Sequence, residues 1–280
     1  MKYFLALFIT AVNLTACSQG DAALHNERPL PANMQYNYDC VTQSSNANKI
    51  TNILNIADDM FNKIATANIE ITDKEQNDFG ETFLTESKKE PGFKMVENTE
   101  TASKLKFILT NLLRVRENPS GINYKIYLLK DESSVNAYTA GGKIFVTTAI
   151  VKKCKTEDQL YAIIGHEIGH NEKGHIKNTM KQLKVGKEYF GDNVNVFLGI
   201  KNKITGAFNQ KNEVEADYYG LDLAYKLGYN VCAIKAFWDD MAASEDKNIM
   251  EDFFRTHPYS DVRSQCLTKH IKNNFKQTCN

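Results

Sequence analysis

Two histidines and a glutamate lie close together in residues 165–170, which read GHEIGH. Positions four residues apart share one face of a helix, so His166 and His170 can bind a single metal ion. Imidazole suits zinc, which lowers the pKa of a bound water to roughly 7. Glu167 would take the proton of that water and pass it to a leaving amine. The pattern predicts hydrolysis of peptide bonds, with a chance match on a solvated helix as the alternative.

A catalytic zinc site needs a third protein ligand. His175 follows His170 by five positions, a rotation of roughly 140° on an ideal helix, so we interpret it as structural and outside the site. In the helical segment 212–217 (NEVEAD), Glu213 and Asp217 are again four residues apart. One carboxylate can bind the ion, and the other can hold a ligand histidine in place. Glu213 is the predicted ligand; by itself, this segment would be a solvated acidic helix face.

The elements that must hold these residues are mostly helical. Thr156 and Gln159 have the spacing of a capping box, which would open the helix that carries residues 165–170. The β-rich segments 124–129 and 135–148, the second of which contains a Gly-Gly turn, predict two or three strands. We expect an α+β fold, a mostly helical metallopeptidase domain around the HExxH helix with a small β-sheet. Further helices are expected over 47–89, 101–117, 176–185, part of 188–208, 211–227, 231–243 and 260–273.

Two features suggest close packing and substrate binding near the helix. Gly165 comes directly before His166 and Gly169 directly before His170, so the two glycines are spaced one helical turn apart. This spacing suggests the close approach of another element, which the sequence does not identify. Residues 144–148 are our candidate for an exposed edge strand that pairs with an extended substrate. The alternative for this strand is full pairing within the sheet.

The two motifs together resemble a known group of enzymes. HEIGH followed by EVEAD is similar to the gluzincin peptidases of the HtpX / CAAX prenyl protease type, and most similar to their small periplasmic lipoprotein members. Residues 136–146 (NAYTAGGKIFV) resemble the strand before the active-site helix, and 257–263 (HPYSDVR) resemble a C-terminal motif. The resemblance covers about residues 100–270. It implies one zinc ion bound by His166, His170 and Glu213, with Glu167 as general base and Asp217 in support.

The C-terminal motif adds two candidate catalytic residues. A peptidase needs a hydrogen-bond donor for the oxyanion of its tetrahedral intermediate, which His257 or Arg263 could supply. His257 could instead fill the open zinc position and keep the enzyme latent. The remaining alternative is that residues 256–258 only cap the last helix.

The N-terminus predicts export. An apolar run over residues 3–12 is too short to span a bilayer but fits a secretory signal. Residues 14–17 (LTAC) resemble a lipobox, which predicts a signal peptide over 1–16, lipidation of Cys17, a tether over 17–46 and the peptidase domain over 47–280. An ordinary signal peptide cut near Ala16 is the alternative. Ser18 after the cysteine favours the periplasmic side of the outer membrane.

Charge and cysteine content limit the partners. Lys+Arg and Asp+Glu both number 34, so no basic surface for nucleic acid is expected. An exported chain permits disulfides, for which we prefer Cys232–Cys266 and then Cys40–Cys279.

The resemblance implies protein substrates that are unfolded or extended, in quality control of the cell envelope. A second hypothesis is a lipoprotein that binds assembling membrane proteins in the same cleft without cutting them. A purely structural zinc site is disfavoured, because only three protein ligands are visible.

Overall fold

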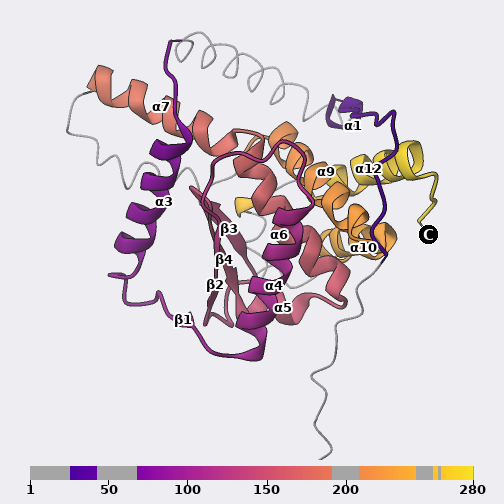
Figure 1. Ribbon diagram of the computed structural model, residues 1–280, viewed down its shortest axis with the longest axis horizontal. Coiled ribbons are helices and arrows are strands. Elements are labelled where there is room, and N and C mark those ends of the chain that lie inside the picture. The colour runs from indigo at the N-terminus through magenta and orange to yellow at the C-terminus, as the bar shows by residue number, and fades with distance from the viewer. Residues whose placement is uncertain (1–25, 43–67, 191–207, 244–254, 258–259, 280) are drawn as a thin grey trace, which may run out of the picture.

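The computed structural model describes residues 26–42, 68–190, 208–243, 255–257 and 260–279. The predicted signal peptide, Cys17 and the expected helices before residue 68 and over 191–207 lie outside these residues. Described helices surround a small sheet (Figure 1). This arrangement confirms the predicted α+β fold. The helices are α1 (Asp39–Thr42), α3 (Asp73–Ser87), α4 (Glu100–Arg114), α5 (Thr148–Lys153), α6 (Glu157–Glu172), α7 (His175–Phe190), α9 (Gln210–Lys226), α10 (Val231–Ala242) and α12 (Ser260–His270), which continues as the π-helical turn η2 (Ile271–Phe275).

The sheet has four strands in the order β1-β2-β4-β3. Strands β2 and β4 pair in parallel, and the other two pairs are antiparallel. A turn at Gly141 and Gly142, both with positive φ, closes the β3–β4 hairpin. The strands are β1 (Met95–Val96), β2 (Lys125–Leu129), β3 (Ala137–Ala140) and β4 (Lys143–Thr147).

The expected edge strand is not at the edge. Strand β4 is inserted between β2 and β3, so it is paired on both sides and every residue in it is buried. The prediction that residues 144–148 offer a free edge is therefore wrong. The end of the sheet nearest the HExxH helix is β3, because the hairpin folds it onto the outer side of β4.

Helices cover both faces of the sheet. On one face, Phe145 packs with Phe79 and Phe83 of α3. On the other, Ile144 and Val146 join the larger core that contains α4, α6, α9 and α10. Helix α6 is buried continuously from Gln159 to Asn171, so it lies in the interior of the domain between the sheet and α9 (Figure 1).

Helix α6 begins where predicted but without the predicted capping box. Thr156 is the N-cap residue, yet its side chain makes no capping hydrogen bond. The side chain of Gln159 instead accepts from the backbone N–H of Lys155 at 2.7 Å and donates to the carbonyl of Ala233 at 3.1 Å. Gln159 thus ties the start of α6 to α10, and this tertiary contact replaces the local one.

The described part of the expected tether packs on the domain. Arg28 donates to the carbonyls of Tyr225 and Tyr229, at 2.8 and 2.6 Å, and Tyr36 donates to Asp222 at 2.8 Å. Contacts of the domain therefore extend before residue 47, into residues 26–42.

The disulfides join Cys40 to Cys266 and Cys232 to Cys279, so both predicted pairings are wrong. Helix α1 lies on α12, which brings Cys40 to Cys266, and the C-terminal residues after η2 return to the start of α10. Cys154 is free. Among the described residues, no helix combines the length and apolar character that a membrane crossing would need.

Candidate metal centre

The two histidines of α6 face one another at the helix surface turned toward α9. Their Nε2 atoms lie 2.9 Å apart, and both side chains are buried. Burial lowers the pKa of His166 and of His170, which favours the neutral rings that metal ligation requires. Helix α6 therefore holds the predicted histidine pair close together as neutral rings, the form that can bind a cation.

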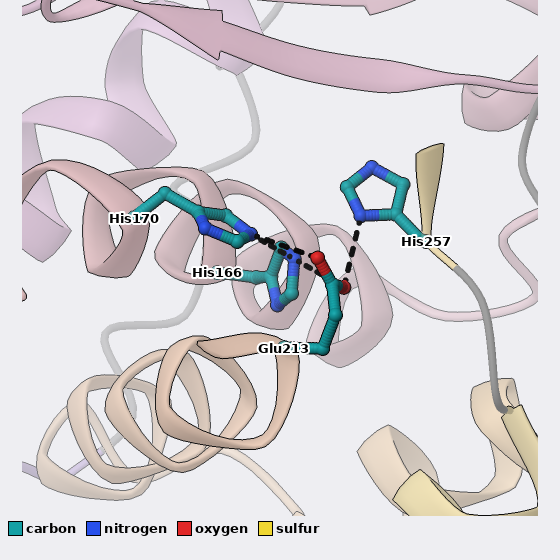
Figure 2. A group of neighbouring side chains, drawn as sticks. All are labelled: His166, His170, Glu213 and His257. Atoms are coloured by element: carbon teal, nitrogen blue, oxygen red, sulfur yellow. Dashed lines mark hydrogen bonds and ion pairs between the residues drawn. The ribbon is translucent and has the colours of Figure 1, made fainter. Parts of the chain in front are cut away.

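Glycines allow α9 to come close enough to supply the third group. A Cβ on Gly165 would lie 2.7 Å from the Cα of Gly220, and one on Gly169 would lie 3.0 Å from the Cα of Ala216. The element that the two glycines admit is thus α9. Its Glu213 carboxylate points toward both histidines (Figure 2) and lies 3.5 Å from the Nε2 atom of each.

Asp217 lies one turn further along α9, behind His166. The Nδ1–H of His166 donates to Asp217 Oδ1 at 2.9 Å, which leaves the lone pair of Nε2 directed at the centre. The structure therefore places Asp217 where the spacing predicted it, as the acceptor that orients a candidate ligand.

Arg263 reaches the site from α12 but binds its carboxylates. It makes a two-point ion pair with Asp217 and lies 2.9 Å from Glu213 through Nη1. Its guanidinium stacks on Trp238, 3.8 Å from the ring centroid, and the side chain is fully buried. Burial alone would raise the pKa of Glu213, but Arg263 and then His257 hold it below its usual value. Arg263 thus keeps the acidic groups ionised at the back of the site.

His257 belongs to neither α6 nor α9 and enters the site from a separate segment (Figure 2). Its Nδ1 lies 3.2 Å from Glu213 Oε2, and its Nε2 lies 2.8 Å from the carbonyl oxygen of Ala137 and 3.7 Å from Glu167 Oε1. The structure therefore places His257 at the site, and both of its predicted functional roles stay predictions. It touches the expected general base and a candidate metal ligand at once.

Glu167 points into a small cavity beside these groups. The cavity is lined by Ala137, Ile163, His166, Glu167, Trp238 and His257. Burial raises the pKa of Glu167 to about 7, which suits a carboxyl group that must both accept and donate a proton near neutral pH.

Two residues next to the site, His175 and Glu215, were not predicted to contact it; His175 was interpreted as structural and outside the site. His175 Nδ1 lies 3.0 Å from His170 Nδ1, and His175 Nε2 lies 3.0 Å from Glu215 Oε2. On an ideal continuous helix His175 would face away from the site, but α6 ends at Glu172 and the chain turns through Gly174, with φ of +76°, before α7. The sequence signal for this turn was Gly174, which stands directly before His175.

The donor set fits a metal ion. One ligand atom from each of His166, His170, Glu213 and His257 lies within 4.8 Å of all the others. The buried atoms Glu213 Oε1 and Glu167 Oε1 have no hydrogen-bond donor within the described part of the chain. Two lone-pair nitrogens at 2.9 Å repel each other unless they share a cation. Imidazoles with one carboxylate are the ligands that zinc prefers.

Comparisons with known proteins agree with this site. The model of peptidase family M48 matches residues 99–271, which include every group described above. The chain is 31% identical over 182 residues to metalloprotease LoiP of Escherichia coli, which covers 60% of this chain and 69% of LoiP.

More distant relatives are longer. The chain is 29% identical over 158 residues to mitochondrial metalloendopeptidase OMA1 of Arabidopsis thaliana, covering 53% of this chain and 32% of that protein. It is 24% identical over 175 residues to the beta-barrel assembly-enhancing protease of Yersinia pestis, covering 55% and 36%. The chain thus spans about a third of the length of these two relatives.

Proposed function

The chain belongs to peptidase family M48 and is a metalloendopeptidase, and from this premise we propose that its metal is zinc and its substrates are unfolded or misassembled envelope proteins. The family match confirms the predicted class of enzyme. The observation that carries the proposal is the convergence of His166, His170 and Glu213 beside the buried carboxyl group of Glu167.

The side chains divide the chemistry between them. His166, His170 and Glu213 would hold the zinc ion, which when bound supplies Lewis-acid activation of water and of the scissile carbonyl. Glu167 takes the proton of the attacking water and delivers it to the leaving amine. Asp217 and Arg263 keep the first histidine and Glu213 in place, so they act at one remove from the reacting atoms.

The position of strand β3 supports an extended polypeptide as the substrate. Strand β3 ends the sheet, and its residue Ala137 lines the same cavity as Glu167. A substrate backbone laid along β3 would form strand-like hydrogen bonds that require no particular side chain. Unfolded chains offer such a backbone, whereas folded proteins have already paired theirs.

We place the enzyme on the periplasmic side of the outer membrane, held by lipid on Cys17. The lipobox-like residues 14–17 support this location, and two disulfides suit an oxidising compartment. The name of the Yersinia pestis relative describes a protease that enhances β-barrel assembly, which is compatible with the proposed substrates. Membrane fractionation of the wild type and of Cys17→Ser tests the anchor: equal distributions of the two proteins would refute it.

The activity is tested with Glu167→Gln. We expect the variant to retain its zinc, measured by metal analysis, and to lose casein cleavage by roughly 10²–10⁴-fold. Glu86→Gln, at a partly exposed glutamate of α3 that pairs with Lys89, is the matched control and should cleave normally. Wild-type protein that binds no zinc would overturn the assignment. Zinc-loaded Glu167→Gln that cleaves like the wild type would overturn the role of Glu167, and binding of unfolded protein without any cleavage would favour the non-enzymatic hypothesis.

A further inference from the structure

Within the described residues, His170 Nδ1 has no carboxylate partner like the one that Asp217 provides for His166. Its Nδ1 faces another imidazole, His175, whose far nitrogen contacts Glu215. We propose that His175 and Glu215 are positioning residues that together fix the orientation and the tautomer of the metal ligand His170. This inference rests on the proposed zinc site, and it assigns a task to two residues that take no part in the chemistry above.

The direction of each hydrogen bond follows from the chemistry of the groups. A glutamate carboxylate only accepts, so the proton of a neutral His175 is on Nε2 and is donated to Glu215. The Nδ1 of His175 is then a lone-pair acceptor. His170 must donate its own Nδ1–H to that acceptor at 3.0 Å, which leaves the Nε2 lone pair of His170 facing the metal centre. The chain of three groups therefore selects the tautomer that can bind zinc.

The geometry of α9 explains why a second histidine is needed. Glu213 and Asp217 are four residues apart and share the face of α9 that meets α6. Glu215 lies between them in sequence and is rotated by roughly 200° from Glu213, so it cannot reach His170 directly. His175 fills the gap, because its two nitrogens point in different directions and contact both groups.

The position of His175 is held firmly. Helix α7 starts at His175, directly after the turn through Gly174. The next residue, Ile176, is fully buried in the smaller core that contains Phe79 and Phe83 of α3. Phe208 stacks on His170 with ring centroids 4.1 Å apart and also contacts His175, at 5.9 Å. His175 is only 2% exposed, so water cannot easily replace it as the partner of His170.

Loss of such an outer hydrogen bond typically weakens metal binding by about 10–100-fold. The measurement is the rate of zinc release to a chromogenic chelator, made in the Glu167→Gln background so that no turnover contributes. We expect release to be about 10–100-fold faster in His175→Leu. His175→Asn, which can present an oxygen near the Nδ1 position, should recover part of this loss. Glu215→Ala should also release zinc faster, whereas Lys211→Met should not, because Lys211 contacts Glu215 at 3.5 Å without touching either histidine.

A second measurement needs no variant that could misfold. Long-range proton–nitrogen spectra of the zinc-loaded wild type should show His170 protonated at Nδ1 and His175 at Nε2. The reversed tautomers would overturn the proposal, as would release of zinc from His175→Leu and Glu215→Ala at the parental rate. These outcomes differ from failure of the proposed function itself, which would appear as a parent protein that binds no zinc.

Discussion

Arg263 and Asp217 form a two-point ion pair behind the candidate metal centre. Nε donates to Oδ2 and Nη2 to Oδ1, each at 2.7 Å, and both side chains are buried. The sequence motif suggested that Arg263 stabilises an oxyanion, but its donors are directed at Asp217 and Glu213. Its task in this structure is therefore to neutralise the two acidic groups that hold the site together.

We predict that Arg263→Leu lowers the free energy of unfolding by about 3–5 kcal/mol, because it leaves buried carboxylates without their partner. Zinc content should fall with it. Arg263→Lys retains the charge but loses the fork, so it should be less destabilised. Urea unfolding and metal analysis check both variants. A loss of activity with unchanged stability and zinc content would instead identify Arg263 as the oxyanion donor.

His257 should restrain the enzyme in the conformation seen here. One of its ring nitrogens lies within 4.8 Å of a ligand atom from each of His166, His170 and Glu213, and a site closed by four protein groups lacks the open position that catalysis needs. Removing its contacts with Glu213 and Ala137, at about 1 kcal/mol for each hydrogen bond, should raise peptidase activity of His257→Ala by roughly five- to thirtyfold. Initial rates on casein at equal zinc content measure this. A fall of roughly 10²-fold or more would show that His257 assists the reaction.

Sequence spacing predicted the pairs of residues that lie within one helix, and it failed for contacts between segments that are distant in the sequence. His166 with His170 and Glu213 with Asp217 are pairs within single helices, so their spacing was sufficient to predict them. The task of Arg263 depends on how α12 docks, and the contact of His175 depends on a turn through Gly174. The predictions of an edge strand and of the disulfide pairs were wrong for the same reason. Both features are set by tertiary packing, which leaves no periodic signal in the sequence.

Gly220 controls the separation of the two helices that carry the candidate ligands. A Cβ at this position would lie 2.6 Å from the backbone nitrogen of His166 and 2.7 Å from the carbonyl oxygen of Ala162. Gly220→Ala should therefore push α9 away from α6, cost about 1–3 kcal/mol of stability and weaken zinc binding. Gly92→Ala is the control, since nothing lies within 4 Å of its Cβ position. Thermal unfolding and zinc titration of both variants would expose an error if Gly220→Ala bound zinc normally.

The disulfide pairs of the structure, which differ from those predicted from the sequence, can be tested directly. Digestion of the unreduced protein should yield one linked peptide pair containing Cys40 and Cys266 and another containing Cys232 and Cys279. Cys154 should carry any alkylating label added after denaturation. In the folded protein it should react slowly at pH 8, because burial raises the pKa of its thiol to about 12 and little thiolate is present.

The Cys40–Cys266 bond also has an expected energetic effect. It joins α1 to α12, the helix that presents Arg263 to the site, across 226 residues of sequence. Replacing both cysteines by serine should cost about 2–5 kcal/mol, since the bond restricts the unfolded chain over a long loop. Because α12 would lose its covalent link, zinc should also be released faster than from a Cys154→Ser control. A peptide pair linking Cys232 to Cys266, or Cys40 to Cys279, would contradict both this bond and the packing of α1 on α12.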